Sequence, residues 1–297
     1  VVIITTKSGT EGKTRITYNA YYGKKKLATQ LDVLDPYEYV LYQYERSRGS
    51  VPDQRRFERA YGTWEQLDSL YSDAAGTKWQ DEVFGRDART YTHNLGISGG
   101  TEQYNYNLSY THNNDQGIMI GSGYVRNSIN FKFQAKASRR LTFDFDARYS
   151  DLDVMGAGTS DEGQSSQNRL RHSVMYRPAN GLVDFSDDAE LIFDDDEYYS
   201  TSNLTNPVEL TYDEYRNKKT ISANLNAALS YEIINNLVIR TDAGYYDWKQ
   251  DDDRFYGLTT YLARRYADLP VVRVGKDTRS TFRWANTLNY SYAIGGN

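Results

Sequence analysis

Cysteine is absent from this sequence of 297 residues, so disulfides, thiol catalysis and cysteine-ligated metals are excluded. Long hydrophobic runs are also lacking. No stretch approaches the roughly 18 apolar residues of a membrane-spanning helix, although barrel strands of about 9–11 alternating residues would escape that test. The net charge of -5 provides no basic field for a nucleic-acid partner.

Tyrosine is the abundant residue, with 28 copies beside 10 phenylalanines, whereas proline occurs only 5 times. Apolar residues make up 39% of the chain and the mean hydropathy is -0.76, which is more polar than an ordinary globular protein. A polar, tyrosine-rich and proline-poor composition suits long strands that have one apolar face and one polar face. The composition therefore favours an all-β fold.

Alternation with a period of two residues is the strongest local signal. In "LTFDFDARY" (141–149) the apolar residues and Tyr149 share one face, and Thr142, Asp144, Asp146 and Arg148 share the other. Similar segments recur along the chain. Together they predict antiparallel strands at about 13–23, 89–100, 102–113, 122–137, 140–153, 216–232, 236–250 and 278–293.

The connections between these segments alternate in length. Tight connections at 99–103, 137–140 and 233–236 follow every second strand. The connections after the other strands are long at 24–88, 151–215 and 249–277, and intermediate at 112–123. A soluble antiparallel sheet with one polar face would show the same alternation of side chains. Sorting of short and long loops to opposite ends is typical of outer-membrane barrels, and favours that fold.

Two of the long connections have helical patterns. In "DPYEYVLYQYERS" (35–47), Asp35 suits the N-cap and Pro36 the first helical position. A second helix is predicted over 166–176. The expected architecture is thus an all-β fragment of a large transmembrane β-barrel, with about eight strands and with long loops that carry short helices.

Catalytic patterns are missing. His93, His112 and His172 have no metal-ligand spacing, and the first two are interpreted as wall residues of predicted strands. Asp144 and Asp146 could form an acid/base pair, but their shared polar face favours two solvated wall residues. We therefore expect no enzyme activity, no cofactor and no metal.

Two charged runs leave alternatives open. The acidic segment 187–199 could bind calcium through oxygen ligands, but it lacks the spacing and glycine of an EF-hand, so a solvated loop is favoured. The lysines at 24–26 could pair with lipopolysaccharide phosphates, and a solvated surface is the simpler interpretation.

Three stretches are similar to one known family. "VVIITTKSGTEGKTRITYNAYYG" (1–23) resembles the junction between plug and barrel in SusC/RagA-type TonB-linked outer-membrane transporters, and "LDPYEYVLYQYE" resembles the helix that follows their first strand. The resemblance is densest in "WQDEVFGRDARTYTHNLGISGGTEQYNYNLSYTHNNDQGIMIGSGYVRNSINFKF". Its landmarks are Trp79, Asp81, Phe84, His93, Asn94, Ser98 to Gly100, Tyr104, Asn105, Tyr110, Gly117, Ile118, Tyr124 and Arg126. The match is clear over about residues 1–150 and general in style beyond them.

The resemblance implies a domain division. Residues 1–8 would be the last strand of a plug domain and its crossover, and residues 9–297 would be the N-terminal part of a transmembrane barrel that has 22 strands in this family. The chain would then be an internal piece of a larger transporter, and "AIGGN" (293–297) would form another tight turn after the eighth strand.

The resemblance also implies a function, which is TonB-dependent import of an oligosaccharide, or a peptide, across the outer membrane of a Gram-negative, Bacteroidota-like cell. The implied partners are a SusD/RagB-like surface lipoprotein that acts as a lid, outer-membrane lipids, and TonB through an N-terminal region outside this sequence. Aromatic residues of the loops are candidate substrate contacts: Trp64, Trp79, Tyr198 and Tyr199. The alternatives are a non-transporting barrel with a structural or adhesive role and a soluble β-sheet enzyme, and no acid/base cluster supports the second.

Overall fold

The computed structural model describes residues 12–156, 158, 168–182 and 204–291. The predicted plug strand, the acidic run at 187–199 with Tyr198 and Tyr199, and the final turn at 293–297 lie outside the described residues. The strands are β1 (Gly12–Lys25), β2 (Ala88–Gly100), β3 (Tyr104–Gln116), β4 (Gly123–Lys136), β5 (Leu141–Met155), β6 (Glu214–Ile234), β7 (Leu237–Tyr256) and β8 (Val271–Tyr290). The helices are α1 (Pro36–Ser47), α2 (Val51–Tyr61), α3 (Trp64–Tyr71), α4 (Trp79–Phe84), α5 (Arg169–Met175), α7 (Pro207–Asp213) and α8 (Tyr261–Arg265).

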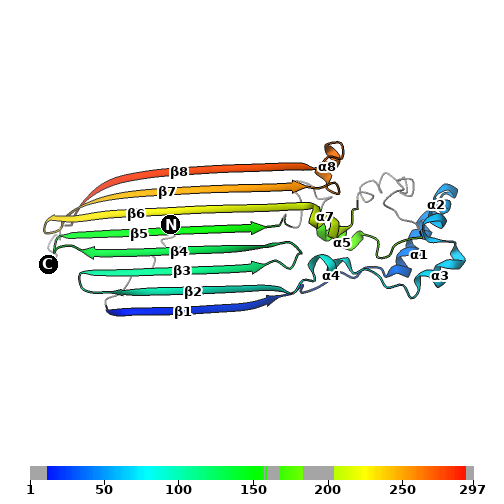
Figure 1. The fold of residues 1–297 in the computed structure, drawn as a ribbon, viewed down its shortest axis with the longest axis horizontal. Coiled ribbons are helices and arrows are strands. Elements are labelled where there is room, and N and C mark those ends of the chain that lie inside the picture. The colour runs from blue at the N-terminus through cyan, green and yellow to red at the C-terminus, as the bar shows by residue number, and fades with distance from the viewer. Residues whose placement is uncertain (1–11, 157, 159–167, 183–203, 292–297) are drawn as a thin grey trace, which may run out of the picture.

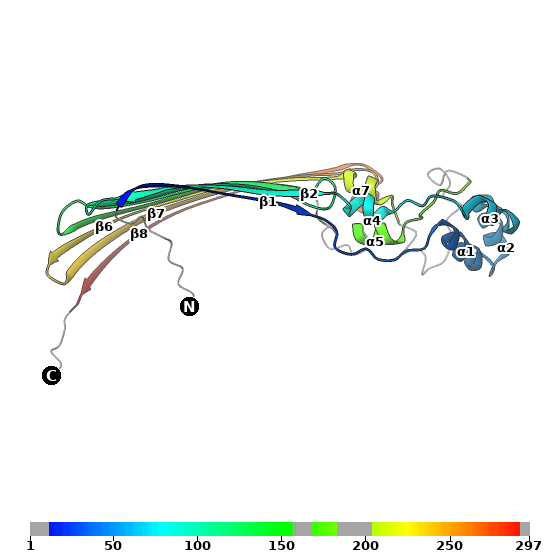
Figure 2. The same ribbon diagram turned by 90° about the horizontal axis from the view of Figure 1, so that it is seen from below.

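All eight strands form one antiparallel sheet whose order in space is their order in the sequence. Each strand pairs with the next along the chain, and within the described residues β1 and β8 are the two open edges. Seen edge-on, the sheet is a single curved layer (Figure 2). The predicted set of eight antiparallel strands is confirmed.

The helices lie beyond one end of the sheet and leave both of its faces uncovered (Figures 1 and 2). The other end carries the tight turns between β2 and β3, β4 and β5, and β6 and β7. Asn236 adopts the left-handed conformation in the last of these turns, with φ at 68°, which asparagine tolerates better than most residues. The predicted alternation of short and long connections is therefore present. None of the described helices has both the length and the apolar character needed to cross a membrane.

The strand register places like side chains side by side across the whole sheet. One row on the apolar face contains Ile16, Ile97, Leu108, Phe131, Ala147, Leu225, Tyr245 and Phe282. The adjacent row on the opposite, polar face contains Arg15, Ser98, Asn107, Lys132, Asp146, Asn226, Gly244 and Arg283. A shift of one residue in any strand would exchange its two faces, so this register is strongly specified.

The buried hydrophobic clusters lie in the loops instead of on the sheet. One joins α1, α2 and α3 through Val40, Phe57 and Leu67, each at most 1% exposed. A smaller one contains Val83, Phe84 and Met119. By contrast, Ile16 and Phe282 on the apolar face of the sheet are 67% and 69% exposed. An apolar face of this size, left open by the described residues, is the mark of a surface that contacts lipid or another protein.

The helix predicted over 35–47 is present as α1. The Asp35 carboxylate accepts from the Glu38 amide at 2.8 Å, and the Glu38 carboxylate accepts from the Asp35 amide at 3.2 Å, which forms a capping box. The helix predicted over 166–176 corresponds to α5. Five short helices were not predicted from the sequence: α2, α3, α4, α7 and α8.

The strands β6, β7 and β8 extend further toward the helices than their predicted ranges. The segment 251–256 was predicted as loop, but it continues β7, with Asp252 between two cations. Arg216 donates to Asp252 at 3.0 Å from the neighbouring strand, and Arg254 donates to it at 2.8 Å. These ion pairs keep a highly acidic segment extended.

Candidate functional site

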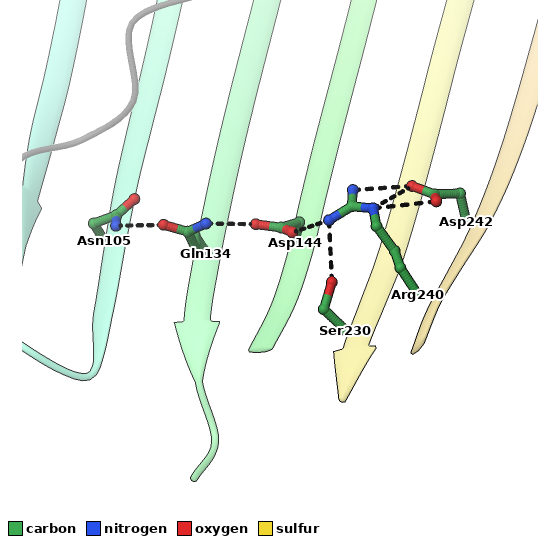
Figure 3. A network of polar contacts seen from close by, with 6 residues as sticks. All are labelled: Asn105, Gln134, Asp144, Ser230, Arg240 and Asp242. Atoms are coloured by element: carbon green, nitrogen blue, oxygen red, sulfur yellow. Dashed lines mark hydrogen bonds and ion pairs between the residues drawn. The ribbon is translucent and has the colours of Figure 1, made fainter. Parts of the chain in front are cut away.

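The polar face of the sheet carries a chain of hydrogen bonds that crosses from β3 to β7 (Figure 3). The Asn105 amide donates to Gln134 at 3.1 Å, and the Gln134 amide donates to Asp144 at 2.7 Å. The Asp144 carboxylate also accepts from Arg240 at 3.0 Å, and Arg240 in turn donates to Asp242 at 3.0 Å. Arg240 also donates to the Ser230 hydroxyl of β6 at 3.2 Å, so the network joins five neighbouring strands of the polar face.

This network gives the two carboxylates of β5 their partners. Asp144 is paired with Arg240, and Asp146 is paired with Arg148 at 3.0 Å. Each carboxylate is therefore engaged by an arginine, Asp144 from β7 and Asp146 from its own strand. Their placement on the polar face agrees with the interpretation as wall residues, with the difference that both are held in ion pairs.

A hollow of about 390 Å³ lies on the polar face beside this network. Lys132, Arg148 and Arg283 contribute cations to its lining, and the carboxylates of Asp144, Asp146 and Asp242 contribute anions. Such a surface presents positive and negative charges, and hydrogen-bond donors and acceptors, to water. It suits the passage of a hydrated solute and does not suit contact with lipid.

A larger pocket of about 1000 Å³ lies among the loops, between the 30–34 segment, α1, α4 and the end of α5. Trp79 lines it at the start of α4. The Trp79 indole donates to the Arg177 carbonyl at 2.8 Å and packs edge-on against Tyr176, with ring centroids 5.2 Å apart. These contacts tie the first long connection to the third and fix the indole in the pocket wall.

The four predicted substrate contacts are not brought together. Trp79 lines the loop pocket, whereas Trp64 does not; it begins α3, is 51% exposed and packs on Tyr44 at 4.6 Å between ring centroids. Tyr198 and Tyr199 lie outside the described residues. Sequence reasoning missed Tyr39 and Tyr42 of the pocket lining. Their signal was available, since both belong to the predicted helix of residues 35–47.

A buried polar cluster anchors the loops to the strand ends. Arg169 of α5 forms an ion pair with Glu214 at the start of β6, and both side chains are almost fully buried. His172 Nδ1 lies 3.1 Å from the Thr205 amide, and Arg264 of α8 donates to the Thr205 hydroxyl at 2.6 Å. Burial lowers the pKa of the Arg264 guanidinium. The cluster holds α5, α7 and α8 together as one support for the loop end.

No family model matches the chain, but two curated proteins do. TonB-dependent receptor P3 of Formosa agariphila is 23% identical over 292 residues, which are 97% of this chain and 25% of the relative. TonB-dependent receptor SusC of Bacteroides thetaiotaomicron is 32% identical over 129 residues, which are 42% of this chain and 11% of the relative. The chain therefore spans about a quarter or less of the length of these relatives.

Solved structures show the same fold. The RagAB peptide importer in its closed-closed state matches with a TM-score of 0.70 at 16% identity, over 98% of this chain and 34% of that chain. A second structure, of the RagAB peptide transporter, matches with a TM-score of 0.67 at 17% identity, over the same shares. The chain is therefore similar in sequence to TonB-dependent receptors, including SusC over part of its length, and it has the fold of about a third of the matched RagAB chain.

Proposed function

We propose that this chain forms part of the wall and the extracellular loops of an outer-membrane importer. Its cargo would be an oligosaccharide or a peptide, taken up by TonB-dependent transport. The observation that carries the proposal is the two-faced sheet, in which a mainly apolar face lies back to back with a charged, cross-linked polar face. One face would contact the lipid and the other would line the lumen.

The dimensions of the apolar face support a membrane location. On β5 it runs from Leu141 to Tyr149, eight residue steps of about 3.3 Å each, or roughly 26 Å along the strand. A barrel strand tilted by about 40° would span about 20 Å of membrane thickness with this segment, before the bordering tyrosine side chains are added. Outer-membrane barrels carry an apolar band about 25 Å tall with aromatic girdles at both borders. Tyrosines lie at both borders here: Tyr18, Tyr110 and Tyr149 toward the loops, and Tyr104, Tyr231 and Tyr290 toward the tight turns.

The positions of the connections also suggest how the chain would be oriented in the membrane. Because the long connections all lie at one end, that end would face the outside of a Gram-negative, Bacteroidota-like cell, where a SusD/RagB-like lipoprotein could close over it. Residues 9–297 would belong to the barrel. Residues 1–8 would end the plug on which TonB acts, and they lie outside the described residues.

Substrate contact is proposed for the aromatic residues of the loops. Trp79 has the better support, since it lines a pocket together with Tyr39, Tyr42, Glu38 and Arg46. Aromatic faces that alternate with charged and amide groups can hold the sugar rings of an oligosaccharide, or the side chains and backbone of a peptide. For Trp64, Tyr198 and Tyr199, substrate contact is proposed from the sequence alone.

Uptake measurements test the proposal. The gene for the full-length receptor is deleted, and uptake of labelled oligosaccharides and labelled peptides is compared with that of the parent and of a strain without TonB. We expect uptake of one class of solute to be lost in both mutants. The wild-type receptor gene should restore that uptake in the deletion strain. Unchanged uptake of every solute would contradict import and favour a structural or adhesive barrel.

A further inference from the structure

Two of the three histidines in the sequence meet on the sheet. His93 of β2 and His112 of β3 are directly opposite in the strand register, although 19 positions separate them in the sequence. Their imidazole rings are stacked with centroids 6.5 Å apart and planes 26° apart. Both lie on the apolar face, one row beyond Leu95 and Tyr110 on the side of the loops.

The hydrogen bonds of His112 define its tautomer. Asn127 Oδ1 lies 2.8 Å from His112 Nδ1 and also accepts from the Tyr110 hydroxyl at 2.9 Å. A carbonyl oxygen can only accept, so Nδ1 must carry the hydrogen. In the neutral ring, the lone pair is then on Nε2.

His93 is oriented in the same way. Its Nδ1 lies 2.6 Å from the Tyr18 hydroxyl, which can accept the Nδ1 hydrogen and leave a lone pair on Nε2. Over the described part of the chain, neither Nε2 atom has a hydrogen-bond partner. In metal-binding histidines, one ring nitrogen usually donates its hydrogen to a neighbouring group. This contact fixes the tautomer and the ring orientation, and leaves the other nitrogen for the metal.

The spacing suits one shared ion. Directly opposite residues on neighbouring strands have Cβ atoms about 4.5–5.5 Å apart, and two Zn–N bonds of about 2.0 Å place their nitrogens about 3–4 Å apart. The ring of Tyr91 lies 5.8 Å from each imidazole and borders the site.

We propose that His93 and His112 form a site for a divalent transition metal ion, Cu²⁺ or Zn²⁺, on the loop side of the apolar face. Imidazole ligands suit these ions. Within the described residues, no group of three or more His, Asp or Glu side chains could hold a metal. Water molecules would therefore fill the remaining coordination positions of the ion, and the bound ion would cross-link β2 to β3.

Electron paramagnetic resonance of Cu²⁺ tests the site in the full-length receptor, purified in detergent without a histidine tag. The wild-type protein should bind one more Cu²⁺ than His93→Gln or His112→Gln, and its difference spectrum should show two equatorial nitrogens. Heat-modifiable migration on gels confirms that each variant remains a folded barrel. Equal Cu²⁺ binding by the wild type and both variants would overturn the proposal.

Asn127 supplies the second arm of the test, because it is a positioning residue. Asn127→Ala removes the acceptor of His112 Nδ1 and should weaken Cu²⁺ binding about 10- to 100-fold. Asn127→Asp keeps an acceptor, now charged, and should bind at least as tightly as the wild type. If both variants bind with equal affinity, Asn127 does not orient a ligand, and the assignment of Nε2 as the metal-binding atom is wrong.

Discussion

At the scale of single residues, the stability of the loop end depends on polar groups that are buried away from water. Arg169 and Glu214 form the most deeply buried of the described ion pairs, and Arg169 also donates to the Gly158 carbonyl at 3.1 Å. Burial of two charges is costly, and their attraction offsets that cost only while both are present. Removal of one partner is therefore more damaging than replacement of both.

Glu214→Ala should destabilise the loop end by about 3–5 kcal/mol, because Arg169 would keep a buried and unpaired charge. Limited proteolysis of the full-length receptor should show faster cleavage between β5 and β6. The matched control is Glu209→Ala on α7, an exposed carboxylate whose loss should leave cleavage unchanged. Equal cleavage of the two variants would show that the buried pair does not hold the loop.

The histidine pair shows what sequence reasoning cannot reach at this scale. Neither histidine has a metal-ligand spacing along the chain, and each is an ordinary wall residue within its own strand. The pair exists only because the register sets Leu95 opposite Tyr110 and therefore His93 opposite His112. A sequence pattern specifies which face a residue occupies but leaves its cross-strand neighbour open.

At the scale of elements, α1, α2 and α3 form a separate small unit around Phe57. The side chain of Phe57 is fully buried, and its ring packs against Tyr44 and Tyr61 with centroids 5.5 Å and 5.4 Å away. This unit lies beyond the end of the sheet (Figure 1). Its stability therefore depends on its own core.

Phe57→Ala should cost about 3–5 kcal/mol and unfold this helical unit while the sheet persists. Hydrogen exchange of the full-length receptor should show lost protection over residues 36–71 and unchanged protection over β3, β4 and β5. Arg55→Ala on the same helix is the control, since its side chain is exposed. Loss of protection in both regions would mean that the helices and the sheet unfold together.

The strands were easier to predict than the helices for a physical reason. Strands such as β4 and β5 are 14 and 15 residues long, and their apolar and polar residues alternate strictly over 129–135 and 141–149, so the period of two stands out. Helix α8 has only five residues and α7 only seven, and neither is long enough to show a helical period. The start of α7 was nevertheless marked, because Asn206 caps it and Pro207 occupies its first turn.

At the scale of the whole molecule, the sheet has two open edges and an apolar face without a cover among the described residues. Both features are unfavourable in water, since open edges pair with other chains and exposed apolar surface aggregates. In a bilayer the edges would be as costly, because unpaired backbone groups find no water there. The arrangement is suited to a chain that continues the barrel on both sides.

Residues 1–297 expressed alone should therefore aggregate. Size-exclusion chromatography and thermal unfolding in detergent-free buffer provide the measurement. We expect material in the void volume and no cooperative transition. A monodisperse protein with a cooperative melt would mean that the sheet has another way to cover its edges and its apolar face.

The central claim is that alternate residues of each strand face lipid and water, and single-cysteine scanning of β4 tests it most directly. Each residue from Ile129 to Ala135 is replaced in turn in a cysteine-free full-length receptor in membranes, and each cysteine is reacted with a polar maleimide. We expect fast labelling at Asn130, Lys132 and Gln134, and slow labelling at the four positions between and beside them. Uniform labelling along the strand, or labelling in the opposite phase, would contradict it.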